Sequence, residues 1–593
     1  MFQQWRMTFI VAAIAAATFC TGLGLTRLWD VDEPMNAVCG QEMFARGDWI
    51  VPTFNGQLRT DKPILIYWCM IAVYHFLGVT EMAARLPSAL AGIGTIVLTF
   101  HLGRLMFDRR TGLVASCLAS SALMFAVLAR GATPDSLLIV CITASITSFV
   151  AGVAKRRGGH FSGTLDGRGT PTPVQAHGLP VLACVGMYVS MGLAVLAKGP
   201  IGVVMPLGII GCYLLFFDDV EAAPADAGWL RRVVRYFAPR RILSIARTLR
   251  LGWGLPLVAL VALPWYIMVG IRTNGEWITG FLGTHNVGRF MHPMEHHRGL
   301  PIYYVVAIFA GFFPGSVFLP VGLWSMITFI RRNNARRGAA AFLLCWIGCY
   351  VGFFTFAATK LPNYVVPCYP ALAIATGYWL SAMIDRAAVR DWRLWAGYGS
   401  FVGVGVIIAV AVAIVARVLL KLDPLPALPG IVAVIGGIAS LMLLYRGRVG
   451  GSVGAFLVTC FLFTLSAMTY TAWRASELED GPMLAEQIHT LIDTQSHAAP
   501  HVATLRYSCP SLVFYLGNTV ERLGAPGEIP AFFEGGGDAL VMSRTAYENC
   551  RDQLPSTLAV LAETQRFMKR RESVVIVGRS TELARGDARD EVR

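Results

Sequence analysis

The chain has 593 residues, of which 55% are hydrophobic and 15% are charged. Average soluble domains carry about 25% charged residues, so this composition excludes a soluble protein of such length and indicates a polytopic membrane protein. The formal net charge is +14. Basic loops on one side of a membrane and contact with anionic lipids account for that charge, and we therefore expect no nucleic-acid partner.

Apolar windows near or above the length that a helix needs to cross hydrocarbon, roughly 18 residues, recur along the chain. In lipid, only helices and closed barrels satisfy the hydrogen bonds of all backbone N–H and C=O groups. Since the apolar windows have the length of helical spans, we predict an all-α polytopic membrane domain with about 13 transmembrane helices. The expected spans are residues 8–25, 87–106, 113–130, 134–153, 180–197, 200–217, 252–271, 302–329, 339–358, 364–384, 394–418, 428–446 and 451–470.

One further apolar segment, residues 63–79, is short and begins with Pro63. If it does not span, the Lys- and Arg-rich loops all fall on the side of the N-terminus, which the positive-inside rule assigns to the cytoplasm. We therefore expect an interfacial or partly re-entrant helix here, with the N-terminus inside and the C-terminus outside. Residues 1–19 resemble a signal sequence, and we expect them to remain as an uncleaved anchor.

Two soluble parts flank the expected spans, an outer loop at 26–86 and a tail at 472–593. We assign residues 1–471, including this loop, to a transmembrane domain and the tail to a second domain. The tail combines a helical stretch at 482–492 with the strand-like runs HVATLRY, SLVFYLG, DALVMS and SVVIVGR. This alternation predicts a small α/β domain, for which we expect a structural or lid role.

The tail also contains Cys509 and Cys550. A disulfide persists in an exported domain, but spacing alone does not establish the required geometry. The sequence therefore leaves open whether Cys509 and Cys550 form a disulfide or are two free thiols.

Charged residues gather at the outer ends of the expected spans. Because charge at membrane depth is costly, its grouping on one face predicts a polar cavity there. The group comprises Asp32, Glu33, Arg59, Asp61, Lys62, Arg85, Arg130, Asp135, Lys198, the loop 272–301, and Lys360 with Tyr364.

The acidic members of this group have two readings. Asp32 and Glu33 precede Pro34, and Asp135 follows Pro134, so all three acids suit an ordinary helix start. Their shared location on one face, with Arg130 nearby, favours a catalytic role. Asp135 would then pair with a substrate amine or with Arg130.

Three lysines stand at outer span exits: Lys62 before Pro63, Lys198 in AKGP and Lys360 in TKLPNY. Each either anchors the membrane interface or contacts a phosphate as a point charge. Together with Arg289 they would neutralise the phosphates of two lipid substrates.

The loop 281–304 is dense in polar residues. His292, Glu295, His296 and His297 could bind Zn, but their spacing matches no closed tetrahedral pattern, and we expect no required metal. His285, Asn286 and Arg289 are suited to hydrogen bonding with a sugar or a phosphate.

Several motifs carry a family resemblance. WDVDEP at 29–34, GDWIVPTFNGQLRTDKPILIYW, ARLPSALAG, ATPDS, AKGP, HNVGRF with HHRGLPIYY, and KLPNYVVPCYP resemble the bacterial members of the protein O-mannosyltransferase superfamily. Within it the chain is most similar to the aminoarabinose transferases of lipid A. The resemblance covers about residues 5–380.

This resemblance implies a GT-C-type glycosyltransferase in the bacterial inner membrane, with its active site and tail facing the periplasm. The implied donor is undecaprenyl-phosphate-linked 4-amino-4-deoxy-L-arabinose, and the implied acceptor is a phosphate of lipid A. Such a modification confers resistance to polymyxin and other cationic antimicrobial peptides. No cofactor is required, and the oligomeric state stays open.

The resemblance also assigns roles to residues. Asp32 matches the acidic motif after the first span, Lys62 the phosphate-contacting lysine, and Asp135 the second acidic position. The remaining candidates divide into one further acid (Glu33), phosphate contacts (Arg59, Arg289, Lys198, Lys360 and Tyr364) and contacts of the sugar or acceptor (His285, Asn286 and Arg130).

The expected reaction is displacement at the anomeric carbon with a lipid phosphate as leaving group. An acceptor phosphate, whose second pKa is about 6, is already ionised, so no general base is needed and Asp32 would orient the acceptor or bind the sugar ammonium. With a protein hydroxyl as acceptor, as in the O-mannosyltransferases, Asp32 would act as base.

Two alternatives of other classes are a lipid flippase and an inactive lipid-binding scaffold. A flippase places ionisable groups at mid-membrane or at broken helices. The expected spans instead carry few charged residues in their middle, and the charged residues gather at the outer ends.

Overall fold

The computed structural model describes residues 2–161, 178–218, 236–288, 291, 299–492, 500–566 and 572–579. The chain divides into two compact units. The first comprises Met1–Leu23, Thr60–Cys69 and Arg85–Thr471, and the second comprises Gly24–Arg59, Met70–Ala84 and Ala472–Arg593. Residues of the outer loop thus group with the tail, and Thr471 and Ala472 fall on either side of a boundary between the units.

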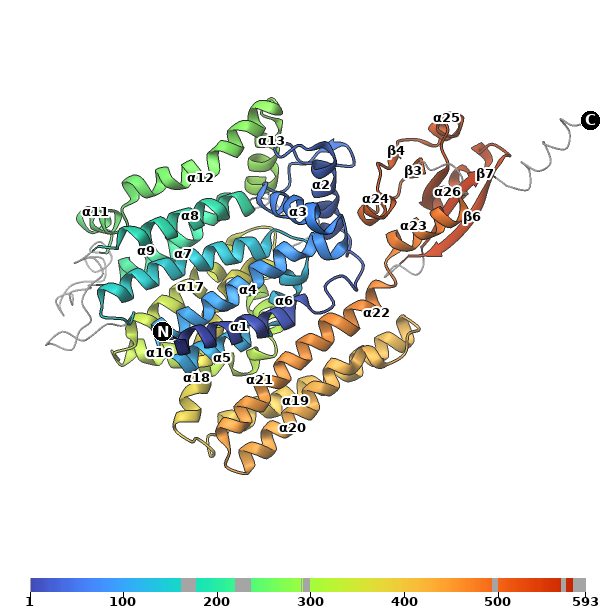
Figure 1. The fold of residues 1–593 in the computed structure, drawn as a ribbon. Coiled ribbons are helices and arrows are strands. Elements are labelled where there is room, and N and C mark those ends of the chain that lie inside the picture. Colours follow the sequence, from blue (N-terminus) through green and yellow to red (C-terminus); the bar gives the residue numbers. More distant parts are fainter. Residues whose placement is uncertain are drawn as a thin grey trace, which may run out of the picture. The chain divides into compact units, whose positions relative to one another are not determined.

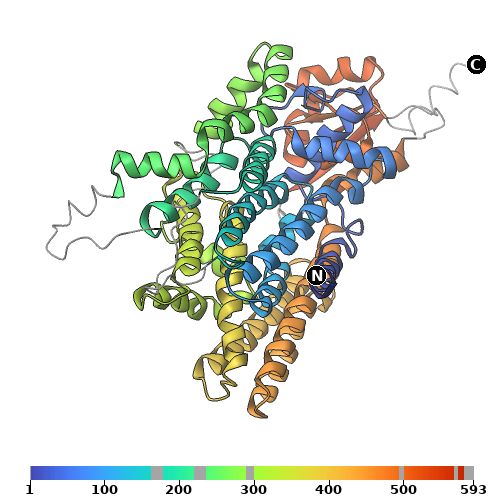
Figure 2. The same ribbon diagram turned by 60° about the vertical axis from the view of Figure 1, so that its left-hand side comes forward.

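The first unit is helical (Figures 1 and 2). Nine helices of the described residues are long and apolar enough to cross a membrane. They are α4 (Glu81–Met106), α7 (Asp135–Arg156), α8 (Val181–Lys198), α12 (Leu251–Arg272), α17 (Arg337–Phe356), η4 with α18 (Pro362–Asp385), α19 with part of η5 (Trp392–Val418), η6 with α20 (Leu425–Tyr445), and α21 with η7 and α22 (Val449–Ser476). The prediction of a polytopic helical membrane protein is confirmed.

Two pairs of shorter helices are apolar enough only when taken together, and each pair is sharply bent at a short break. α5 (Arg109–Ser120) meets α6 (Leu123–Arg130) at 67°, and α15 (Tyr303–Gly311) meets η3 and α16 (Gly315–Arg331) at 117°. If each pair counts as one span, the described residues provide eleven.

Two of the thirteen predicted spans are not among these helices. The window at 8–25 falls on α1 (Phe2–Cys20), of which Trp5–Cys20 is a shorter apolar helix, and the window at 200–217 falls on α9 (Ile201–Phe216). Sixteen residues in α9 rise about 24 Å, which is less than the roughly 30 Å of hydrocarbon. The ambiguous segment 63–79 holds the 13-residue helix α3 (Leu65–Leu77), likewise too short to cross.

Small residues allow neighbouring helices of the first unit to approach closely. A Cβ on Gly112 of α5 would lie 2.5 Å from the Phe100 carbonyl oxygen of α4, and one on Gly430 of α20 would lie 2.4 Å from the Ala409 backbone nitrogen of α19. Helix contacts in membranes depend on such backbone approach because lipid removes the hydrophobic driving force between helices. The packing of these spans is therefore specified by glycine positions.

The second unit contains two sheets. α2 (Asp32–Arg46) precedes a short hairpin of β1 (Thr53–Phe54) and β2 (Gln57–Leu58), whose two turn residues, Asn55 and Gly56, have φ of 54° and 73°, as a primed hairpin turn requires. The tail forms a five-stranded sheet in the order β4-β3-β5-β7-β6. Its strands are β3 (Val502–Leu505), β4 (Glu521–Leu523), β5 (Ala539–Ser543), β6 (Leu558–Gln565) and β7 (Ser573–Arg579), and its helices are α23 (Asp480–Leu491), α24 (Pro510–Leu516), α25 (Ile529–Glu534) and α26 (Arg544–Cys550).

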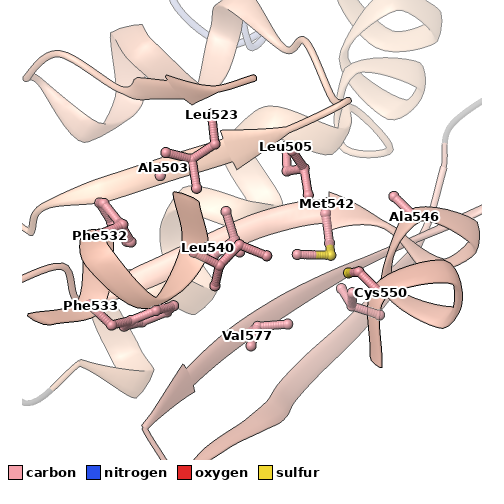
Figure 3. Close-up of a cluster of buried hydrophobic side chains, with 12 residues drawn as sticks. Ala503, Leu505, Leu523, Phe532, Phe533, Leu540, Met542, Ala546, Cys550 and Val577 are labelled. Carbon is pink, nitrogen blue, oxygen red and sulfur yellow. The ribbon is translucent and has the colours of Figure 1, made fainter. Parts of the chain in front are cut away.

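The sheet of the tail is mixed, with β3 parallel to β4 and β5 and with β7 antiparallel to β5 and β6. Leu540, Met542 and Val577 of the central strands pack against Phe532 and Phe533 of α25 (Figure 3). The predicted α/β tail domain is confirmed.

One tail element was wrongly predicted. The run SLVFYLG, expected as a strand, lies in the helix α24, which ends at Gly517 with φ 73°. A short apolar run does not distinguish a strand from a buried helix, and a glycine with positive φ is a common helix terminator.

Cys509 and Cys550 are both free thiols in the structure. Cys550 lies in the tail core. Cys509 lies 3.2 Å from the Asp30 carboxylate, and burial, reinforced by that carboxylate, raises the pKa of its thiol to about 12.

Candidate active site

Asp135 occupies the first turn of α7 and is buried, with 7% of its surface exposed. Its Oδ1 accepts a hydrogen bond from Lys198 Nζ at 2.5 Å and another from Asn363 Nδ2 at 3.2 Å. The positive end of α7 and the ammonium both stabilise the ionised carboxylate. Three separate elements, α7, α8 and η4, thus meet at this carboxylate.

Lys198 is the last residue of α8. Besides its bond to Asp135, its Nζ lies 5.5 Å from the centre of the Tyr364 ring, which packs against Phe354. An aromatic face and a carboxylate therefore fix the ammonium in place. The structure brings together three predicted site residues, Asp135, Lys198 and Tyr364.

A second polar pair lies in the same unit. Asp61 Oδ1 is 2.8 Å from His285 Nε2, and their side chains are 28% and 19% exposed. His285 belongs to the π-helix η2 (Gly280–Gly288), and its Nδ1 is buried without a hydrogen-bond partner in the part of the chain that the structure describes. Lys62, the predicted phosphate contact, follows Asp61 directly and is half-buried.

The ends of α8 and η2 adjoin at Gly199. Its φ is +81°, and a Cβ there would lie 2.7 Å from the Phe281 ring and 3.7 Å from Asn286 Oδ1. Only glycine combines that backbone conformation with so close an approach. The backbone next to Lys198 therefore lies against η2, the π-helix that carries His285.

Several predicted site residues have structural contacts. Arg130 Nη1 and Nη2 donate to the carbonyls of Thr18, Phe19, Thr21 and Gly22 at 2.7–3.3 Å, so the guanidinium neutralises the negative end of α1. Its expected contact with the sugar or acceptor remains a prediction.

Lys360 and Asn286 likewise make bonds within the fold. Lys360 Nζ donates to the carbonyls of Thr355 and Ala357 at 2.7 and 3.1 Å, at the end of α17, and lies 5.6 Å from the Tyr304 ring. Asn286 Nδ2 donates to the Phe281 carbonyl at 2.7 Å. These bonds tie both side chains to the local backbone, and direct binding of a substrate by either side chain stays a prediction.

In the second unit, α2 begins at Asp32, which is exposed, whereas Glu33 is 6% exposed. Glu33 Oε2 accepts the Trp29 backbone N–H at 2.9 Å, as expected for an acid at a helix start. Arg59 is 4% exposed and donates from Nη2 to Asn36 Oδ1 at 3.2 Å. Of these predicted residues, Asp32 presents its carboxylate at the surface.

The segment before α2 is held by the tail. The backbone N–H groups of Arg27 and Leu28 donate to Ser476 Oγ at 3.2 Å and to Tyr515 Oη at 2.9 Å. Asp30 Oδ1 accepts the Ser511 backbone N–H at 2.9 Å. We call residues 27–30 the strap.

Burial raises the pKa of two acids around the strap. Burial raises the pKa of the Asp30 carboxyl, although the hydrogen bonds that Cys509 and Ser511 donate to it act in the opposite direction. Burial, together with the nearby charges of Asp30, Asp480 and Glu33, raises the pKa of Glu479 to about 8.

Arg289, His292, Glu295, His296 and His297 lie outside the described residues. Among the residues that are described, no group of three or more His, Cys, Asp or Glu side chains is arranged to hold a metal ion. The possible zinc site therefore stays a prediction.

Sequence reasoning gave no role to two residues of the site, Asp61 and Asn363. Asp61 had a local signal, since it stands beside Lys62 in TDKP. Asn363 follows Pro362 in η4 and reaches Asp135 across 228 positions, which no local pattern indicates.

Comparison with known proteins gives consistent similarities. Residues 61–170 match the family described as dolichyl-phosphate-mannose-protein mannosyltransferase. An undecaprenyl phosphate-alpha-4-amino-4-deoxy-L-arabinose arabinosyl transferase of Pectobacterium carotovorum is 26% identical over 68% of this chain, and the match spans less than two thirds of that relative, 64%. A relative of the same name from Pectobacterium atrosepticum is 26% identical over 72% of this chain and 70% of its own length.

The fold has a counterpart among solved structures. The crystal structure of ArnT from Cupriavidus metallidurans bound to undecaprenyl phosphate superposes with a TM-score of 0.70 at 22% identity, covering 96% of this chain and 97% of ArnT. The resemblance drawn from the motifs is thereby confirmed: this multi-pass membrane protein is similar in sequence and fold to the ArnT-like arabinosyl transferases of the GT-C mannosyltransferase family.

Proposed function

We propose that the chain is a glycosyltransferase that takes a sugar from a polyprenyl phosphate, and that it transfers 4-amino-4-deoxy-L-arabinose from undecaprenyl phosphate to a phosphate of lipid A. The observation that carries the proposal is the pair of clusters, Asp135 with Lys198 and Asp61 with His285, beside Lys62. The names of the relatives and the undecaprenyl phosphate of the ArnT structure support it.

The leaving group of this reaction is a phosphate that gains negative charge as the anomeric bond breaks. Fixed cations stabilise such charge without reorganising. Lys198 meets this requirement because Asp135 and the Tyr364 ring hold its ammonium, and Lys62 provides a second cation in the same unit. Neither lysine has to give up a proton, since a phosphate leaves as a stable anion.

His285 adds a directional contact. If its Nε2–H donates to Asp61, the buried Nδ1 accepts a hydrogen bond in neutral imidazole and donates one in imidazolium. An acceptor suits the ammonium or a hydroxyl of the sugar, and a donor suits a phosphate oxygen. Asp32 orients the acceptor phosphate, whose ionised form needs no general base.

The test is mass spectrometry of lipid A from cells that make the aminoarabinose donor but lack their own transferase. We expect an aminopentose addition with this chain, and its loss in Lys62→Ala and Lys198→Ala. Lys155→Ala, which removes an exposed lysine at the end of α7, is the matched control and retains the addition. Unmodified lipid A despite normal expression would reject the proposed acceptor or sugar.

The match to a mannosyltransferase family over residues 61–170 favours one alternative, transfer to a protein hydroxyl with Asp32 as base. The purified chain in nanodiscs, supplied with a polyprenyl-phosphate sugar and a Ser/Thr peptide, distinguishes the two acceptors. A glycosylated peptide whose formation is abolished by Asp32→Asn would establish this alternative.

A further inference from the structure

The helix α11 (Pro239–Thr248) has a face that packs on the protein and a face that does not. Ile245 and Thr248 are 9% and 5% exposed, and α11 contacts α9 and α12. Leu243 on the opposite side and Ile242 on the flank are 49% and 50% exposed. An apolar face turned away from the protein calls for an apolar or interfacial environment.

The helix α11 lies between the end of the apolar helix α9 and the start of the span α12 (Figure 1). Arg241 Nη2 donates to the carbonyls of Leu214 and Asp218 at 3.0 and 2.6 Å, at the end of α9. The span α12 begins at Leu251, three residues after α11. Ten residues rise only about 15 Å, so α11 cannot cross hydrocarbon and lies at the level where the spans leave it.

The charge of this segment has one sign. Residues 236–250, YFAPRRILSIARTLR, contain four arginines and no acidic residue. Arg240 and Arg247 are exposed and lie on one edge of the apolar face, because positions 240, 243 and 247 follow helical spacing. A helix with an apolar face bordered by arginine is suited to lie in a membrane surface.

We infer that α11 is an interfacial helix that binds anionic phospholipid headgroups through Arg240 and Arg247 while Ile242 and Leu243 enter the acyl boundary. Guanidinium groups bind phosphate in a bidentate manner. In the following span α12, Leu260 is 70% exposed, as expected for a helix that faces lipid. The inference concerns a surface apart from the clusters around Asp135 and Asp61, and it does not depend on the proposed reaction.

The experiment compares the full chain in nanodiscs of phosphatidylcholine alone and with about one third phosphatidylglycerol. Hydrogen exchange of residues 239–248 is expected to slow when the anionic lipid is present. In the Arg240→Gln/Arg247→Gln variant this difference disappears. Each basic residue near an anionic surface contributes roughly 1 kcal/mol of attraction. The affinity of the double variant for phosphatidylglycerol, measured by titration, should therefore fall by more than tenfold.

Arg446→Gln/Arg448→Gln is the matched control, because it removes two exposed arginines from the turn between α20 and α21. It should retain the lipid-dependent protection. Ile242→Ser/Leu243→Ser should lose protection in both lipids. Exchange that is equally slow with and without phosphatidylglycerol, or an equal loss in the control variant, would overturn the inference.

Discussion

Asp30 Oδ1 accepts the Ser511 backbone N–H at 2.9 Å across 481 positions of the sequence. Asp32, the exposed acid that starts α2, stands two residues further on. Hydrogen bonds from the strap to the tail thus hold the backbone just before Asp32. A structural role of the tail stays a prediction, which these bonds support.

Asp30→Ala should loosen the strap. The lost bond joins the Asp30 carboxylate to the Ser511 N–H of α24, and bonds to charged groups contribute about 2 kcal/mol. We expect faster hydrogen exchange in residues 27–33 and in α24, and a lower rate of sugar transfer. Glu486→Gln, which removes the 3.7 Å ion pair with Arg27, serves as control. Exposed pairs contribute little, and unchanged exchange in Asp30→Ala would contradict the role of the strap.

Glu479 predicts a pH dependence of the second unit. The pKa of its carboxyl is raised from an ordinary 4.5 to about 8, by burial first and then by Asp30, Asp480 and Glu33. The folded state therefore binds more protons than the unfolded state between these two values, so the stability contributed by Glu479 falls as pH rises through this window. Arg566, 3.6 Å from Asp480, keeps its charge throughout.

Glu479→Gln removes this proton linkage. The variant should unfold with a flatter dependence on pH between about 5 and 8 than the parent, and it should be the more stable protein above pH 8. Thermal melting of the two proteins across this range, with fluorescence as readout, measures the difference. Parallel curves would show that Glu479 is not the responsible group.

The sequence predicted the polytopic helical class and the class of the tail because long apolar runs and alternating short ones indicate which segments leave water. It could not choose helix or strand for SLVFYLG, since both bury a seven-residue apolar run equally well. At the site, Asp135 and Lys198 were each indicated by a span exit. Their pairing across 63 positions, and the contact of Asn363, depend on how α7, α8 and η4 pack. Spacing along the chain does not contain that information.

Asp135 and Lys198 should be energetically coupled. Breaking a largely buried pair by removing one partner costs about 3 kcal/mol or more, because the other charge stays buried. We expect Asp135→Ala and Lys198→Ala each to lower the melting temperature, and the double variant to lose less than the sum of the two. Additive losses in such a cycle would show that the ammonium and the carboxylate do not stabilise one another.

Gly199→Ala tests whether the two polar clusters form one site. The added Cβ would lie 2.7 Å from the Phe281 ring at a φ of +81°, so α8 or η2 must shift and the distance between Lys198 and His285 must change. Sugar transfer should fall more than tenfold, since displacements of about 1 Å cost up to 100-fold in rate. Gly208→Ala in α9, where a Cβ meets nothing within 4 Å, is the matched control and should retain full activity. If both variants were equally active in the lipid A assay, Lys198 and His285 would act independently, because an enforced shift between them would then leave the reaction untouched.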